Sequence, residues 1–223
     1  MADGFSRASG LPGIILCTSG PAATNTVTGI STAYADSVPV LIFTGQVPTP
    51  FLGSDAFQEA DHIGITRTCT KHNTLVRKTI DLPKAIAEAL YISNTGRKGP
   101  VLVDMPKDVL IGESVFNFPK NVKISSYEDS VNLKSTEYKN FMNAFKNSKK
   151  PLFIFGRGAC SSSSKKYIIK LLKKFKSPAL TSILALGLIS ESQYNCGVLD
   201  YSSSKISKNL SLIHIWRCRR LRT

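Results

Sequence analysis

Two stretches in the first half of this 223-residue chain carry residue types that could do chemistry. Residues 18–25 (TSGPAATN) combine small side chains with Pro21, which fixes one φ angle, so this backbone could approach a ligand closely. Residues 44–59 (TGQVPTPFLGSDAFQE) contain Gln58, whose amide is both a donor and an acceptor of hydrogen bonds. The first stretch is therefore a candidate for close backbone contact with a ligand, and the second offers a side chain for polar contacts.

Cations and glycines mark two further candidates. Residues 96–108 contain Arg97 and Lys107, and a long cation suits a ligand that bears phosphate. In the second half, Gly156-Arg157-Gly158 follows an apolar run and could approach a phosphate. This turn does not complete the pattern GxGxxG, so alone it is a weak signal.

Each candidate also has an interpretation that needs no ligand. Residues 18–25 could be an ordinary connection from a strand to a helix cap, and Ser54 or Asp55 could begin a surface helix. The cations could be solvated charges, as most Lys and Arg side chains are. We assign no role to Lys71 and His72, because a lone histidine is more often structural than catalytic.

The elements that must position these residues alternate between strand and helix. Residues 25–36 predict a helix with Asn25 as N-cap, and residues 81–93 predict a second helix capped by Asp81. Residues 46–53 contain two prolines and cannot be regular. Apolar runs bounded by turn residues predict buried strands at 13–18, 38–44, 74–78 and 101–103. This alternation predicts an α/β fold with a parallel sheet, helices on both faces, and ligands at the carboxyl ends of the strands.

The second half predicts part of another α/β domain. Residues 111–135 are polar and without a period, which indicates a linker. Further on, we expect helices at 136–147 and 164–176 and strands at 152–155 and 179–183. Lysines of the second helix fall mostly opposite an apolar face made by Ile168, Leu171, Leu172 and Phe175.

The charge argues against a nucleic-acid partner once it is located. The chain holds 29 Lys and Arg against 15 Asp and Glu, a net charge of +14, and residues 1–110 are neutral. The excess sits in the second half, largely on what we expect to be solvated faces, and no nucleic-acid motif is present.

No apolar run approaches the ~18 residues of a membrane span. Five scattered cysteines without a CxxC pair fit the cytoplasm.

The final residues differ from the rest. Residues 210–223 (LSLIHIWRCRRLRT) contain no lysine, four arginines and the only tryptophan. They resemble the translation of a sequencing adapter, so we expect this tail to be non-native. An ordinary basic tail is the alternative.

The motifs taken together resemble the large, catalytic subunit of acetolactate synthase (acetohydroxyacid synthase), a thiamine-diphosphate enzyme. The pieces SGPAATN, TGQVP, SDAFQE, TKHN and GRKGPVLVDMPKD occur in the family's order between Met1 and about Val109. A weaker likeness continues through residues 151–187. The resemblance implies a pyrimidine-binding domain at residues 1–110, a linker at 111–135, and the start of a Rossmann-like, FAD-associated central domain at 136–209.

The resemblance also implies roles for single residues. Pro21, Ala22 and Asn25 would contact the aminopyrimidine of the cofactor, although the family usually has glycine in place of Ala22. Gln58 would lie near the thiazolium and the substrate oxygen, as the catalytic residue of this segment, where a donor could stabilise negative charge. The substrate channel is implied for Val47, Pro48, Phe57 and Lys107.

FAD is the second cofactor that the resemblance implies. Arg97 would bind it, and so would the turn at Gly156 and Gly158, where Arg157 replaces a usual glycine. The stretch 184–187 matches another FAD-contacting segment.

The family's cofactor-activating glutamate would precede Met1, and its Mg²⁺ motif belongs to a third domain, so we expect a fragment that is inactive alone. The complete enzyme would join two 2-oxoacids with release of CO₂ in branched-chain amino-acid biosynthesis. It would act as a homodimer with the active site between subunits and a regulatory small subunit. Another thiamine-dependent carboligase or decarboxylase, such as glyoxylate carboligase, and a non-catalytic α/β binding module stay open as alternatives.

Overall fold

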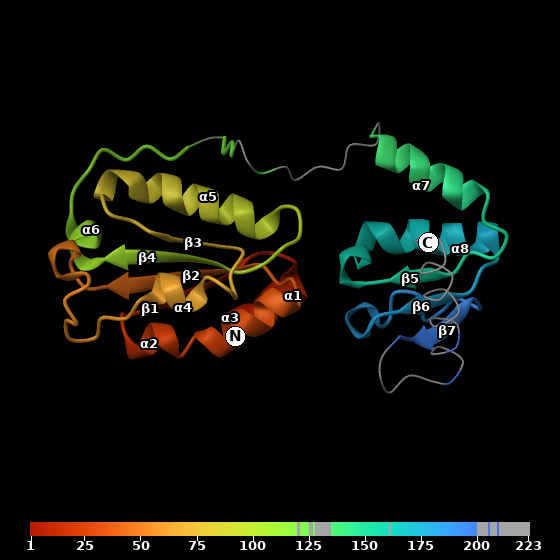
Figure 1. The fold of residues 1–223 in the computed structure, drawn as a ribbon, viewed down its shortest axis with the longest axis horizontal. Coiled ribbons are helices and arrows are strands. Elements are labelled where there is room, and N and C mark those ends of the chain that lie inside the picture. The colour runs from red at the N-terminus through yellow and green to blue at the C-terminus, as the bar shows by residue number, and fades with distance from the viewer. Residues whose placement is uncertain are drawn as a thin grey trace, which may run out of the picture. The chain divides into compact units, whose positions relative to one another are not determined.

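The structure is a computed structural model that describes residues 1–119, 121–124, 127, 135–160 and 162–199, together with 205 and 209. The chain divides into two compact units, Met1–Ser130 and Val131–Thr223. Each unit is α/β, as predicted (Figure 1).

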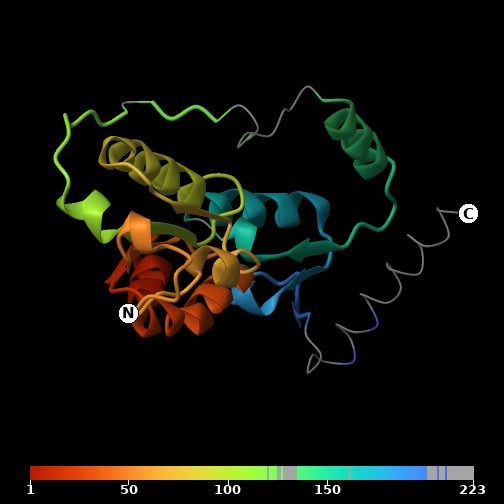
Figure 2. The ribbon, with the colours of Figure 1, turned by 60° about the vertical axis from the view of Figure 1, so that its left-hand side comes forward.

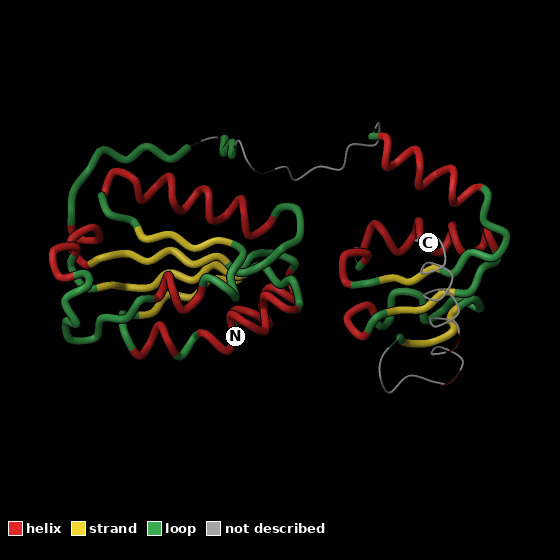
Figure 3. Tube along the Cα trace, viewed as in Figure 1, coloured by secondary structure: helices red, strands yellow, loops and turns green. Residues whose placement is uncertain are grey.

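The first unit is built on a four-stranded parallel sheet. Its strand order is β1-β2-β4-β3, so β1 and β3 form the edges. The ladder pairs Leu16 with Phe43, and Thr44 with Asp104. Because every pairing is parallel, all four carboxyl ends lie at the same end of the sheet. Figure 3 shows the strands in yellow. The strands are β1 (Gly13–Cys17), β2 (Val40–Gln46), β3 (His72–Leu75) and β4 (Val101–Pro106).

Helices cover both faces of this sheet, because alternate strand residues point to opposite sides. In β2, Leu41 packs in the core beneath α5 (Leu82–Asn94), whereas Val40 and Ile42 pack with Ile30 of α3. The ribbons show α5 on one face of the sheet and α3 on the other (Figure 1, Figure 2). The remaining helices are α1 (Ala2–Ser9), α2 (Pro21–Thr24), α3 (Val27–Ala35), α4 (His62–Thr66), α6 (Lys107–Ile111), η1 (Thr49–Phe51) and η2 (Thr79–Asp81).

The second unit holds a three-stranded parallel sheet in the order β5-β6-β7. The amphipathic helix predicted near 164–176 is confirmed: Ile168 and Leu172 are buried in its core, while Lys170 and Lys173 are exposed. The elements are α7 (Thr136–Lys146), β5 (Phe153–Phe155), η3 (Arg157–Ala159), α8 (Ser162–Phe175), β6 (Ala179–Thr181), η4 (Ile183–Ala185) and β7 (Asn195–Val198).

Several local predictions need correction. Asn25 is not an N-cap: the chain turns once as α2, Asn25 follows it, and α3 begins after Thr26. Asp81 is the N-cap residue of α5, as predicted, but its side chain makes no capping hydrogen bond. The strand expected at 74–78 begins earlier, because its ladder with β4 starts at His72 and Val101. The helices α1, α4 and α6 and the strand β7 were not predicted.

Some predictions lie outside the described residues. The tail at 210–223 is one of them, and most of 125–134 in the predicted linker is another. From that linker, Ile124 packs against the core beneath α5, and Tyr127 makes an edge contact with Tyr91 at 5.9 Å between ring centroids. The domain boundaries at 110 and 135 stay predictions.

Candidate active site at the carboxyl ends of the first sheet

The loop after β1 meets the loop that carries Gln58. Gly20 has φ 61°, and a Cβ built on it would lie 2.7 Å from the carbonyl oxygen of Gln58. A side chain at this position would therefore be both strained and obstructed. Pro21 begins α2 directly after this contact and is exposed, and Ala22 is half-buried. The structure thus brings the two predicted cofactor loops together, and Gly20 is the residue at the contact that sequence reasoning missed.

The loop of residues 53–59 has an unusual backbone. Gln58 (φ 61°) and Asp55 (φ 56°) are both in the left-handed region, which side chains rarely adopt. The surface helix that Ser54 or Asp55 could have begun does not form. Gln58 is exposed, and the Phe57 ring is 90% exposed. Both side chains therefore stand free at the edge where the strands end.

The carboxylate of Glu59 closes this loop. Its Oε1 accepts a hydrogen bond from the Gly53 amide at 2.5 Å, and its Oε2 accepts one from the Ala56 amide at 3.0 Å. These bonds favour the ionised form, so they hold the pKa of Glu59 below its ordinary value.

The predicted channel residues at the end of β2 are tied to the end of β4. Asp108 of α6 accepts hydrogen bonds from the hydroxyl and, at 2.9 Å, from the amide of Thr49. The hydroxyl bond, followed by the amide bond, lowers the pKa of Asp108. Val47 is buried, Pro48 is half-buried, and Lys107 is exposed beside Asp108. The segment before Thr49 and the start of α6 are therefore fixed against each other.

A buried polar network lies beneath these loops, and the sequence analysis did not identify it. Asp104 of β4 accepts from the Thr44 hydroxyl at 2.6 Å, from Gln46 Nε2 at 3.1 Å and from His62 Nδ1 at 3.0 Å. Because a carboxylate only accepts, His62 carries its proton on Nδ1, and its buried Nε2 has no partner among the described residues. Polar residues inside two apolar strands were the available signal, but their meeting depends on the register.

Gln46 connects this network to the segment that begins at Val47 and to the Phe57–Gln58 loop. Its Nε2 also donates to the carbonyl oxygen of Ala60 at 2.8 Å, just after the Phe57–Gln58 loop. Its Oε1 accepts from the amide of Val47 at 2.9 Å. One buried amide therefore fixes the bases of both segments, which gives the site a rigid floor.

Arg97 lies at the other end of the sheet. Lys107 lies at the carboxyl end, because β4 runs between Arg97 and Lys107 and separates them. Arg97 donates to the Ser37 hydroxyl at 2.8 Å and to the Tyr34 carbonyl oxygen at 3.1 Å, at the C-terminal end of α3. A cation there is favoured by the helix dipole.

Lys71 lies at the C-terminal end of α5, as Arg97 does at the C-terminal end of α3. Its Nζ donates to the carbonyl oxygens of Ile92 at 2.5 Å and Thr95 at 2.6 Å, and to the Tyr127 hydroxyl at 2.6 Å. This gives Lys71 a structural role as a cation at a helix C-terminus. His72 is exposed at the start of β3, also away from the carboxyl-end loops.

In the second unit, the predicted glycine turn follows β5. Gly156 has φ −102°, and a Cβ on Gly158 would meet no atom within 4 Å. The local fold therefore does not itself require glycine at either position, and their predicted contact with FAD stays a prediction.

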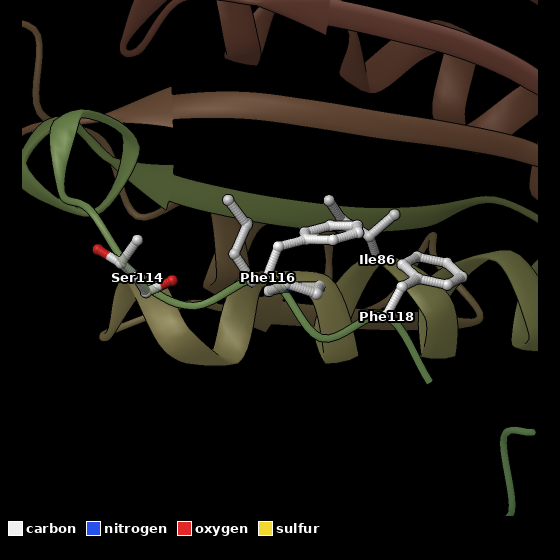
Figure 4. A pocket seen from close by; sticks show the side chains of 7 residues that line it. Ile86, Ser114, Phe116 and Phe118 are labelled. Carbon is white, nitrogen blue, oxygen red and sulfur yellow. The ribbon is translucent and has the colours of Figure 1, made fainter. Parts of the chain in front are cut away.

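An apolar pocket of about 310 Å³ lies on the outer side of α5. Figure 4 shows Phe116 and Phe118 beside Ile86 along that helix. Its lining includes Ser114 and Thr79 but no acid, base or thiol, so it lacks the groups for proton transfer. We place the candidate site at the sheet edge.

Two features are absent from the described residues. They contain no group of three or more His, Cys, Asp and Glu side chains that could hold a metal ion. They also form no helix long and apolar enough to cross a membrane.

Known proteins are similar to most of this chain. Residues 1–65 match the family described as thiamine pyrophosphate enzyme, N-terminal TPP binding domain. The acetolactate synthase large subunits of Buchnera aphidicola subsp. Schizaphis graminum and of Haemophilus influenzae are each 42% identical over 84% of this chain. The acetolactate synthase isozyme 3 large subunit of Escherichia coli is 39% identical over the same share. The chain spans 33% of the length of each of these relatives.

Proposed function

Because the chain belongs to the acetolactate synthase large-subunit family of thiamine pyrophosphate enzymes, we propose that it supplies the cofactor's pyrimidine site and one wall of the substrate channel. The whole protein would condense pyruvate with pyruvate or 2-oxobutyrate, releasing CO₂. The observation that carries the proposal is the contact of Gly20 with Gln58 at the carboxyl edge of a parallel sheet.

The residues of the first loop fit a flat ring. A Cβ on Gly20 would fill the space between the loops, and Pro21 and Ala22 have no long side chain that would keep a ring away. In the proposed site Pro21, Ala22 and Asn25 hold the aminopyrimidine. Thiamine diphosphate, when bound, supplies the chemistry for decarboxylating a 2-oxoacid and transferring the remaining unit.

The residues of the second loop act on the substrate in this proposal. Gln58 donates a hydrogen bond from its amide to the substrate oxygen, where negative charge develops. The channel is bounded by Val47 and Pro48, whose position depends on Gln46, and by Phe57 and Lys107. The large exposed area of Phe57 is compatible with a surface that covers it in the whole protein.

Further parts of the proposal concern the whole protein. We place Mg²⁺ on residues outside this chain, and FAD near Gly156 and Gly158, which follow a parallel strand. Arg97 could add a contact to FAD, since its Nη1 has no partner among the described residues. The relatives are called large subunits, so we propose a small regulatory partner, together with a homodimer and a cytoplasmic, biosynthetic role. The four described cysteines are free, which suits such a compartment.

The test is the activity of the full-length protein that contains this sequence. With FAD present, acetolactate should form from pyruvate only when thiamine diphosphate and Mg²⁺ are added. Gln58→Ala should lower kcat/KM about 10²-fold, as the loss of one donor to developing charge does. Gln193→Ala is the matched control, because Gln193 is an exposed glutamine of the second unit. Activity with glyoxylate alone, or equal activity of the two variants, would overturn the proposal.

A further inference from the structure

The conformation of the Phe57–Gln58 loop requires an explanation from its surroundings. Two non-glycine residues within four positions, Asp55 and Gln58, have positive φ angles. Such backbone angles persist only where neighbouring contacts over-determine them, and they gather at functional sites. Phe57 and Gln58 themselves are exposed, so burial of their side chains does not impose this shape.

Contacts at the two ends of the loop do impose it. The Glu59 carboxylate reaches back to the amides of Gly53 and Ala56, and the Glu59 amide donates to the Ala56 carbonyl oxygen at 2.9 Å. The Glu59 side chain thus bridges the two ends of residues 53–59. Directly after this segment, the Ala60 carbonyl oxygen accepts a hydrogen bond from Gln46 at 2.8 Å.

The bridge made by Glu59 sets where Gln58 lies. Gln58 sits between Ala56 and Glu59, and its backbone packs against Gly20 of the first loop. If the carboxylate no longer held the amides, the loop would lose the contacts that keep Gln58 in the left-handed region. Its amide group would then no longer face a fixed position.

We propose that Glu59 is a positioning residue, whose carboxylate holds Gln58 against the loop of residues 18–25. This inference rests on the proposed function for its catalytic consequence. Its structural part stands separately, since the Gly53 and Ala56 amides report on the carboxylate whatever the protein catalyses.

The first test measures hydrogen exchange of the Gly53 and Ala56 amides in the 223-residue chain. Glu59→Gln should lower their protection factors about tenfold, because hydrogen bonds to a charged acceptor are replaced by weaker ones. Asp55→Asn is the matched control: it removes one negative charge from the same loop, and no hydrogen bond or ion pair involves the Asp55 side chain among the described residues. Equal protection in the parent chain and Glu59→Gln would overturn the inference.

The second test is a double-mutant cycle in the full-length enzyme. Glu59→Gln should lower kcat about tenfold in the parent enzyme and have little further effect once Gln58→Ala is present. Additive losses would mean that Glu59 does not act through Gln58 and would overturn the positioning role. If the parent enzyme made no acetolactate, the proposed function would fail, while the exchange experiment would still decide whether Glu59 holds the loop.

Discussion

Removing the hydroxyl of Thr44 tests the buried network beneath the candidate site. Thr44 and Asp104 are register partners on β2 and β4, both are almost fully buried, and their side chains are 2.6 Å apart. Thr44→Val replaces the hydroxyl with a methyl group of similar volume. The substitution therefore removes a donor to a carboxylate and opens no cavity.

The structure sets the size of the expected effect. A hydrogen bond to a charged group contributes about 1.5–3 kcal/mol. Asp104 keeps two other donors, at 3.1 Å from Gln46 and 3.0 Å from His62, so the carboxylate is not left without partners. We therefore expect Thr44→Val to lower the free energy of local unfolding by about 2 kcal/mol. This loss corresponds to a factor of roughly 30 in the population of the locally unfolded state, from which amides exchange.

Hydrogen exchange of the β2 amides in the full chain measures this loss locally. The result therefore does not require the two units to unfold in one two-state transition. Thr74→Val on β3 is the matched control, because Thr74 is half-buried in the same sheet and its side chain has no hydrogen bond among the described residues. Protection of β2 should fall about 30-fold in Thr44→Val and stay nearly constant in Thr74→Val. Equal protection in the two variants would refute the role of the network.

Two other predictions concern the loops above the network. Gly20→Ala should destabilise the first unit by about 1–3 kcal/mol in thermal unfolding, because φ is 61° and the new Cβ would lie 2.7 Å from the Gln58 carbonyl oxygen. The control is Gly4→Ala, where a Cβ meets nothing within 4 Å. Equal melting temperatures of the two variants would contradict the contact between Gly20 and Gln58. Because the pKa of Asp108 is lowered in the folded chain, its contribution to stability is present above the ordinary value of about 3.9 and is lost as pH falls through the lowered value. The Thr49 amide should lose exchange protection over that acidic range in the parent chain, whereas a similar loss in Asp108→Asn would show that another group is responsible.

The sequence predicted the parts of the fold that depend on local pattern. The run at 13–18 is β1, and the alternation of residues in β2 places Leu41 and Ile42 in the two cores on opposite faces. The carboxyl-end rule brought the loop after β1 and the loop after β2 to the same edge. These features follow from periodicity and from the parallel order of the strands.

The parts that sequence reasoning missed depend on register and on competition between contacts. Thr44 meets Asp104 only through the ladder, and His62 joins them from a helix that no pattern indicated. Arg97 was grouped with Lys107 because they are close in sequence, but β4 lies between them. Asn25 has the chemistry of an N-cap, yet a separate turn of helix ends beside it.

The central claim is tested most directly by the product that the full-length protein forms from pyruvate. With thiamine diphosphate, Mg²⁺ and FAD, we predict acetolactate and CO₂. We also predict that Gln58→Ala loses most of this product while Gln193→Ala keeps it. Acetaldehyde as the main product, or a Gln58→Ala enzyme as active as the parent, would contradict the assignment of this sheet edge as an acetolactate synthase site.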